Sequence, residues 1–228
     1  MSIDFVPFFV SLKLSLFTTI ILLLICFPLA LLFAFRKFRF KSIIESLISL
    51  PLILPPTIIG FYLLLFLSPR GFIGSFLENI FNIRLVFSFA GIVIASCIYS
   101  FPFMLQPLKN GLEGVDKNII EASYTLGKGR ITTFFKAILP NMIKDIYSGI
   151  VMTFAHTMGE FGVILMIGGN IPGQTRVASI AIYDKVEQLD YKFANIYSLI
   201  LIFMSIFILI SLNILKSKKF GGKSSDRN

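Results

Sequence analysis

Apolar residues are concentrated in five long runs, and short polar segments separate them. About 20 consecutive apolar residues let a helix cross the hydrocarbon core of a bilayer, so each run is long enough for one crossing. The pattern therefore predicts an all-α membrane protein, a polytopic bundle of about five transmembrane helices. We place the crossings at residues 8–35, 43–67, 85–105, 141–168 and 194–215.

The composition of the chain also indicates a membrane protein. Of its 228 residues, 56% are hydrophobic and 14% are charged, and its mean hydropathy is +0.86. These values lie outside the range of soluble globular domains. Because the crossings and their connections use almost the whole length, we expect one transmembrane domain over residues 1–228 and no separate soluble domain.

The basic residues predict how the chain is oriented. Four of the 21 Lys and Arg residues lie at 36–41, six at 109–144 and five at 216–227. Cytoplasmic connections carry an excess of Lys and Arg, so we expect the 36–42 loop, the 106–140 segment and a short 216–228 tail in the cytoplasm. The N-terminus of this multi-pass cell-membrane protein would then lie outside and the C-terminus inside. Nucleic-acid binding is the competing explanation of a basic chain, but these clusters flank membrane crossings and no soluble fold carries them.

The polar segment 116–140 has the pattern of two short amphipathic helices. Asp116 can cap the first helix and Gly127 can end it in the left-handed conformation. Apolar residues recur at helical spacing up to Pro140, which suits the first turn of the next span. Such helices can rest on lipid, but the carboxylate of Glu121 is disfavoured against anionic headgroups. It favours a protein groove with basic groups as the partner.

The same segment resembles the EAA loop of ABC-importer permeases, which reads Glu-Ala-Ala, three residues, Gly, nine residues, Ile, any residue, Leu-Pro. Here Ser123 replaces the third residue and Ala137 replaces the Ile, with the spacing intact. The resemblance implies a coupling helix that docks into a separate cytoplasmic ABC ATPase. The residues that match the loop, or replace its third residue, are Glu121, Ala122, Ser123, Gly127, Leu139 and Pro140.

Energy would then come from outside this chain. The stretch 126–130 superficially suggests a phosphate loop, but it lacks the earlier Gly and the Ser or Thr that follows the Lys. We therefore expect no enzyme activity and no cofactor in this chain. The resemblance implies that ATP and Mg²⁺ are bound by the partner ATPase.

Three further segments resemble the molybdate-type branch of the binding-protein-dependent type I importers. They are the Leu-Pro-Pro-Thr stretch within 50–60, the Gly-Glu-Phe-Gly stretch within 154–162, and the loop at 169–175. The resemblance implies import of molybdate, with tungstate or sulfate as alternatives. It also implies an extracytoplasmic molybdate-binding protein as a partner, and we expect two copies of this chain to form the pathway as a homodimer.

Prolines and ionisable residues within the predicted spans mark a pathway or gate. Proline removes a backbone donor, and in a bilayer the freed carbonyls are tolerated only against protein or water. A kink needed only for packing is the alternative. His156 and Glu160 are four residues apart, which on a continuous helix places them on one face. The predicted pathway set is Pro55, Pro56, Thr57, Thr153, His156 and Glu160.

We expect no metal or haem site in this chain. His156 is its only histidine, and a lone membrane histidine is more often a hydrogen-bonded packing residue. Cys26 and Cys97 each lie in an apolar run without a His or Cys at ligand spacing. They read as small packing residues.

The connection 168–192 is the predicted docking surface for the binding protein and the external gate, although a solvated loop without function would look similar. The residues assigned to it are Asn170, Gln174, Thr175 and Arg176. Two other function classes compete with an importer, namely a passive channel and a membrane anchor subunit of a redox complex. A channel needs no coupling segment, and a redox anchor usually needs paired His ligands.

Overall fold

The computed structural model describes residues 3–36 and 39–220, and every regular element among them is helical. The longest helices are α1 (Val6–Phe35), α5 (Phe89–Glu113), α9 (Ile143–Met158) and α12 (Tyr191–Phe220). The shorter elements are α2 (Lys41–Ser49), η1 (Leu50–Leu52), α3 (Pro56–Leu67), α4 (Phe72–Phe81), α6 (Lys117–Thr125), α7 (Arg130–Thr133), the π-helical η2 (Phe134–Ile138), α8 (Leu139–Asn141), α10 (Gly162–Gly168) and α11 (Ala178–Glu187).

The predicted bundle of about five crossings is confirmed. Within the described residues four segments are long and apolar enough to cross a bilayer, at 6–35, 56–81, 89–113 and 191–211. A fifth is present if α9 and α10, which meet at a bend of 62°, count as one span. Of the predicted tail, 216–220 continues α12 and 221–228 lies outside the described residues.

Three of the predicted crossings differ from the helices of the structure. The run 43–67 is not one helix, because Pro55 and Pro56 lack the amide donors that would join α2 to α3. The run 141–168 breaks after Met158, where Gly159 and Gly162 lower helix propensity. The third crossing reaches Glu113 rather than 105, so 106–113 is helix and not connection. The helices α4 and α11 were not expected.

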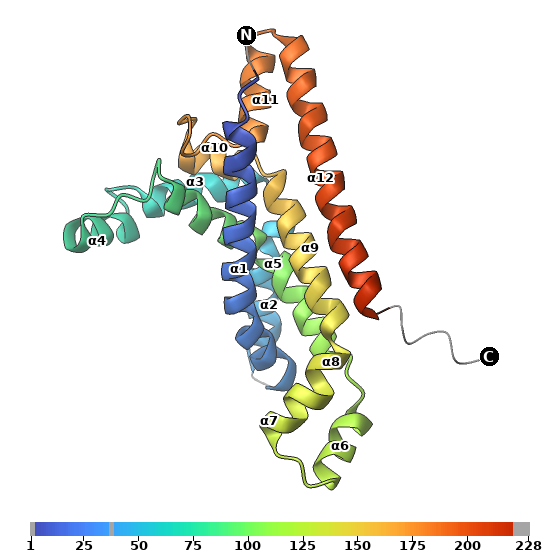
Figure 1. The fold of residues 1–228 in the computed structure, drawn as a ribbon. Coiled ribbons are helices and arrows are strands. Elements are labelled where there is room, and N and C mark those ends of the chain that lie inside the picture. The colour runs from blue at the N-terminus through green and yellow to red at the C-terminus, as the bar shows by residue number, and fades with distance from the viewer. Residues whose placement is uncertain (1–2, 37–38, 221–228) are drawn as a thin grey trace.

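The centre of the bundle is formed by α1, α5 and α9, which pack on one another (Figure 1). Their contact is lined by small hydroxyl side chains, which allow membrane helices to approach closely. Ser15 Oγ of α1 lies 3.6 Å from Met158 Sδ of α9, and Ser100 Oγ of α5 lies 3.0 Å from Thr157 Oγ1. The fully or almost fully buried members of this set are Ser11, Ser15, Thr18, Thr19, Ser96, Ser100, Thr153 and Thr157.

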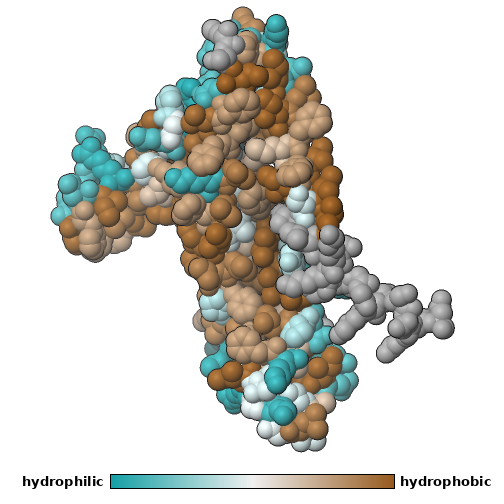
Figure 2. All heavy atoms as spheres, viewed as in Figure 1, coloured by the Kyte–Doolittle hydropathy of each residue, from teal (hydrophilic) through white to brown (hydrophobic). Residues whose placement is uncertain are grey.

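The distribution of hydrophobic and hydrophilic residues over the surface matches the apolar core and polar boundaries of a bilayer. Figure 2 shows a hydrophobic band around the middle of the molecule and hydrophilic residues towards both ends. At one end lie α6 and α7, and at the other lie α11 and the first described residues, while α4 projects sideways (Figure 1). The many exposed Phe, Ile and Leu side chains of α1 and α12 lie in this band, where lipid would cover them.

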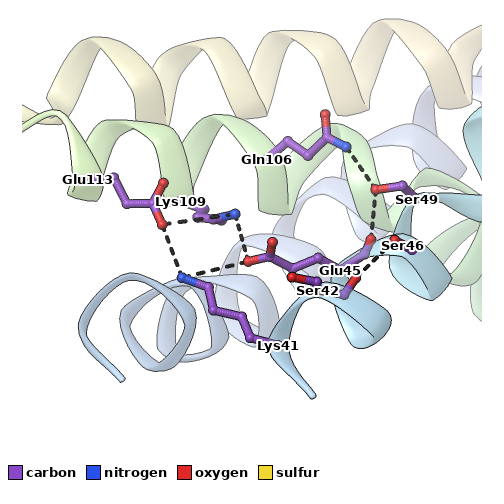
Figure 3. A network of polar contacts seen from close by, with 8 residues as sticks. All are labelled: Lys41, Ser42, Glu45, Ser46, Ser49, Gln106, Lys109 and Glu113. Atoms are coloured by element: carbon purple, nitrogen blue, oxygen red, sulfur yellow. Dashed lines mark hydrogen bonds and ion pairs between the residues drawn. The ribbon is translucent and has the colours of Figure 1, made fainter. Parts of the chain in front are cut away.

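A polar network fastens α2 to α5. The helix α2 has no buried residue, so apolar burial within this chain does little to hold it. Figure 3 shows Lys109 Nζ at 2.6 Å from Glu45 Oε1 and Lys41 Nζ at 3.4 Å from Glu113 Oε1. One turn further along, Gln106 Nε2 donates to Ser49 Oγ at 3.1 Å. These alternating charges position α2 at the end of the bundle that carries α6.

The half-helices α3 and α10 pack closely against each other. A Cβ atom on Gly60 would lie 2.9 Å from Met166 Cβ and 3.3 Å from Val163 Cα, and one on Gly162 would lie 3.0 Å from Pro56 Cβ. Such contacts bring backbones together in the way that small residues do in membrane bundles. We call this pair of half-helices the outer unit.

The close approach at Gly60 generates a prediction. Gly60→Val forces α3 and α10 apart. We expect the free energy of unfolding to fall by about 1–3 kcal/mol, because overpacking displaces side chains and backbone. The measurement is thermal unfolding of the purified protein in detergent. The control is Gly129→Val, since a Cβ at Gly129 meets no atom within 4 Å. Equal unfolding temperatures for the two variants would contradict the packing described here.

Candidate functional site: a docking end and a polar face

The helix α6 forms as the sequence predicts. Asp116 Oδ1 accepts from the backbone N–H of Asn118 at 2.9 Å, which caps the helix. Gly127 has φ of +72°, and its N–H donates to the carbonyl of Tyr124 at 2.9 Å. Glycine reaches this left-handed conformation without a Cβ penalty. The predicted cap and helix end are therefore confirmed.

The helix α6 is presented to solvent rather than packed into the bundle. None of its residues is buried, and Glu121, Ala122 and Gly127 are exposed. Beside it lies a groove of about 480 Å³ whose walls include Phe35 of α1 and Tyr124 of α6. Exposed apolar side chains flank the helix, with Leu126 and Ile131 each 76% exposed. This surface has the character of a docking site, because the groove is largely apolar and its lining also carries the carboxylate of Glu121 and the cations of Lys117 and Arg130.

Side chains that follow α6 fix its position. Ser123 Oγ lies 2.9 Å from Thr133 Oγ1, a fully buried hydroxyl of α7. The departure from the Glu-Ala-Ala pattern thus supplies a hydrogen bond between the two short helices. Leu139 packs on the core of the bundle, and Pro140 occupies the first turn of α8. The second amphipathic stretch is helical throughout 130–141, but it is less regular than expected, because η2 is a π-helical turn.

A polar face runs along α5 and α9. Residues Tyr99, Phe103, Gln106 and Asn110 follow one another at three- and four-residue spacing on α5, and so do Asp145, Ser148, Met152 and His156 on α9. Such spacing places side chains on one face of a helix. Hollows of about 470 Å³ and 430 Å³ lie on this face, and the second reaches Pro56 and Thr57 at the start of α3. We call this surface the polar face.

His156 is held on the polar face by aromatic contacts. Its ring stacks on Phe103 with centroids 4.0 Å apart and lies 4.9 Å from the ring of Tyr99. Its Nδ1 lies 2.9 Å from Ser100 Oγ. Within residues 3–36 and 39–220, no three His, Cys, Asp or Glu side chains converge as metal ligands. The contacts fit a packed, hydrogen-bonded histidine at the edge of the hollow.

One predicted pathway residue points elsewhere, since Thr153 is fully buried in the interior of the bundle rather than on the polar face. Glu160 is only 5% exposed, but it is one of the residues that line the second hollow. His156 and Glu160 do not share a helix face, because α9 ends at Met158. Five polar residues of the face were not expected from the sequence, although polar residues that recur at helical spacing within apolar runs indicate them. They are Tyr99, Gln106, Asn110, Asp145 and Ser148.

At the opposite end, three of the four predicted docking residues stabilise their own loop. Asn170 Nδ2 donates to Asp184 of α11 at 2.7 Å, and Arg176 Nη2 lies 3.5 Å from Asp184 Oδ2. Thr175 is fully buried, and its hydroxyl donates to the carbonyl of Gly168 at 2.7 Å. Gln174 is the exposed member of the set.

Comparison with known sequences identifies relatives over most of the chain. Residues 26–217 match the family described as "Binding-protein-dependent transport system inner membrane component". The molybdenum transport system permease protein ModB of Azotobacter vinelandii is 42% identical over 185 residues, covering 81% of this chain and 82% of that protein. ModB of Escherichia coli K12 is 37% identical, covering 79% and 81%. The sulfate transport system permease protein CysT of Salmonella typhimurium is 31% identical over 194 residues, covering 84% and 70%.

Solved structures share the fold. A bacterial ABC transporter that imports the acidic polysaccharide alginate superimposes with a TM-score of 0.73 at 18% identity, covering 94% of this chain and 80% of that chain. The inward-facing MetNI methionine ABC transporter superimposes with a TM-score of 0.71 at 14% identity, covering 92% of each. From the family match and these relatives, the chain belongs to the binding-protein-dependent transport system inner membrane components, as a permease subunit rather than an enzyme.

Proposed function

We propose that this chain is the permease subunit of an ATP-driven importer that receives molybdate from an extracytoplasmic binding protein. The observation that carries the proposal is a polar face in an apolar bundle. At one end of this bundle α6 has no buried residue and is available to bind an ATPase subunit. The names of its molybdenum-transporting relatives supply the anion. Family membership speaks against the passive channel and the redox anchor.

A second copy of this chain is the partner that covers the polar face. Polar side chains at membrane depth need protein or water around them, and on one chain alone Tyr99, Gln106 and Ser148 would meet lipid. Two such faces opposed to one another enclose a hydrophilic path. The homodimer therefore provides the pathway.

The lining of this path suits passage rather than tight binding of an oxyanion. Tyr99, Gln106, Asn110 and Ser148 carry neutral hydrogen-bond donors. The lining residues of the two hollows include the carboxyl groups of Asp145, nearer the α6 end, and of Glu160, and no lysine or arginine. A dianion would be held weakly by such groups. Strong binding is then the task of the separate binding protein, as the family description implies.

The docking end couples transport to ATP hydrolysis. Lys and Arg residues gather at the end that carries α6, so this end lies in the cytoplasm, and the N-terminus and the loop around Gln174 lie outside. Glu121, Ala122 and Gly127 are the proposed contacts of the ABC ATPase, which binds ATP and Mg²⁺. Closure of two ATPase subunits would move both α6 helices and switch the pathway from inward-facing to outward-facing.

Loss of the docking surface should uncouple the complex. Glu121→Lys reverses the charge in the middle of an exposed helix that buries nothing, so we expect membrane insertion to persist while uptake and ATPase co-purification are lost. Gly127→Val should act similarly, because a left-handed conformation costs a branched residue about 1–2 kcal/mol. The matched control for ATPase co-purification is Glu187→Lys, an exposed charge reversal on α11 at the opposite end of the molecule, which should leave co-purification unchanged. Normal uptake by the Glu121 and Gly127 variants would refute the coupling role.

Anion preference is tested in vesicles that contain the permease, its ATPase and its binding protein. We expect ATP-dependent molybdate uptake to exceed sulfate uptake by at least about tenfold at equal concentrations, a difference of about 1.4 kcal/mol. Tungstate, a tetrahedral dianion similar in size to molybdate, is the closer competitor. Vesicles without ATP are the control. Faster sulfate uptake would instead indicate sulfate transport, the function for which its CysT relatives are named.

A further inference from the structure

Glu160 occupies the break between α9 and α10, and the function proposed above gives it no role. Its side chain is almost completely buried, with 5% of the residue exposed. It lies beside the hollow that Pro56, Thr57 and His156 line. An ionised carboxylate at this position would repel an oxyanion and would be costly to bury.

Three elements meet at Glu160 through hydrogen bonds. Ser96 Oγ of α5 donates to its Oε2 at 2.8 Å. Ser179 Oγ of α11 donates to its main-chain carbonyl at 2.6 Å. Its own N–H reaches the carbonyl of Thr157, in the last turn of α9, at 3.3 Å. The residue therefore ties the helix break to both neighbours.

The surroundings of the carboxyl group do not support a negative charge. Among the residues that the structure describes, none forms an ion pair with Glu160. Its Oε1 is buried and has no hydrogen-bond partner in that part of the chain. The titratable groups that face it are Cys97 and Tyr99 on α5 and His156 on α9. An ionised carboxylate without a cation partner is far more costly to bury than a neutral acid.

Glu160 lies in the connection between α9 of the central bundle and α10 of the outer unit. Its two half-helices, α3 and α10, follow the breaks at 53–55 and 159–161, and they move together because Gly60 and Gly162 bring their backbones into contact. The outer unit meets the central bundle mainly at α5, and Val10 and Leu14 of α1 share an apolar core with α10. Glu160 bonds α5 at the first residues of the joint. A change in its hydrogen bonding would release one end of the outer unit.

We infer that Glu160, as a neutral carboxylic acid, is a positioning residue that latches the outer unit to α5 and α11 and sets the conformation of the outer end of the pathway. The inference rests on the proposed function, since a pathway gives the latch its purpose. The Ser96 and Ser179 hydroxyls are the other parts of the latch. A neutral acid carries no charge to repel the anion, which explains how a carboxyl group in the lining of the hollow is compatible with an anion pathway.

The test compares Glu160→Gln with Glu160→Ala. Glutamine has the shape and hydrogen-bonding capacity of the neutral acid, whereas alanine removes the side-chain bond to Ser96 and leaves only the bond of Ser179 to the main-chain carbonyl. The first measurement is hydrogen exchange of residues 159–168 in the purified full-length permease, and it requires no transport. We expect exchange of the Gln variant to match the wild type and exchange of the Ala variant to be at least about tenfold faster, because the break opens more often.

Two more variants keep the test decisive if Glu160→Ala does not fold. Ser96→Ala removes only the donor to Oε2 and should speed the same exchange about fivefold, the effect of one hydrogen bond. Glu187→Ala removes an exposed carboxylate of α11 and should leave it unchanged. Exchange as fast in Glu160→Gln as in Ser96→Ala would show that the ionised form is needed and overturn the inference. Exchange unchanged in Ser96→Ala would overturn the latch.

The second measurement is ATP-driven uptake and basal ATP hydrolysis in the assembled complex. We expect Glu160→Gln to transport normally, and Ser96→Ala to hydrolyse ATP faster without the binding protein because the outer end is less constrained. If the wild-type complex transports no oxyanion, the proposed function fails while the exchange result still decides the latch. If transport is normal and all variants exchange alike, only the latch fails.

Discussion

A bilayer offers no hydrogen-bond partners in its hydrocarbon core, and this constraint governs where the chain can depart from helix. The chain breaks two of its spans, at 53–55 and at 159–161. The two breaks lie against each other, since Gly162 follows one and contacts Pro56 beside the other. The contact brings protein against one side of both breaks, while residues 52, 53 and 55–57 stay exposed in the single chain. The outer unit and the hollow beside it follow from this pairing of two irregular segments.

The same constraint divides the polar side chains into two sets. Small hydroxyls such as Ser15, Ser100 and Thr157 are buried between α1, α5 and α9, where they bond to one another and to backbone carbonyls. Larger donors such as Gln106 and Asn110 stand on the open side of α5. The first set permits close packing. In the function proposed above, the second set lines a path for a solute once a second copy encloses it.

Local sequence was enough to predict the docking end. Capping by Asp116 and termination at Gly127 depend on backbone conformation within a few residues, and the structure has both. What spacing could not predict was the bond between Ser123 and Thr133, since it joins residues of two helices whose angle is set by the turn between them. The external loop shows the reverse case, because Thr175 and Arg176 look like solvated polar residues until Asp184 and the Gly168 carbonyl are placed beside them.

The sequence by itself determined the membrane class, the approximate crossings, the capped helix α6 and the family, because hydrophobic run length, helix caps and motif spacing are local properties. Only the tertiary structure decided which way the polar residues of the spans face. Thr153 and Glu160 turn inward and Tyr99 and Gln106 outward, since the facing of a helix is set by its neighbours and by the bend at 159–161. A periodicity gives the spacing of a face but not the side of the bundle to which it turns.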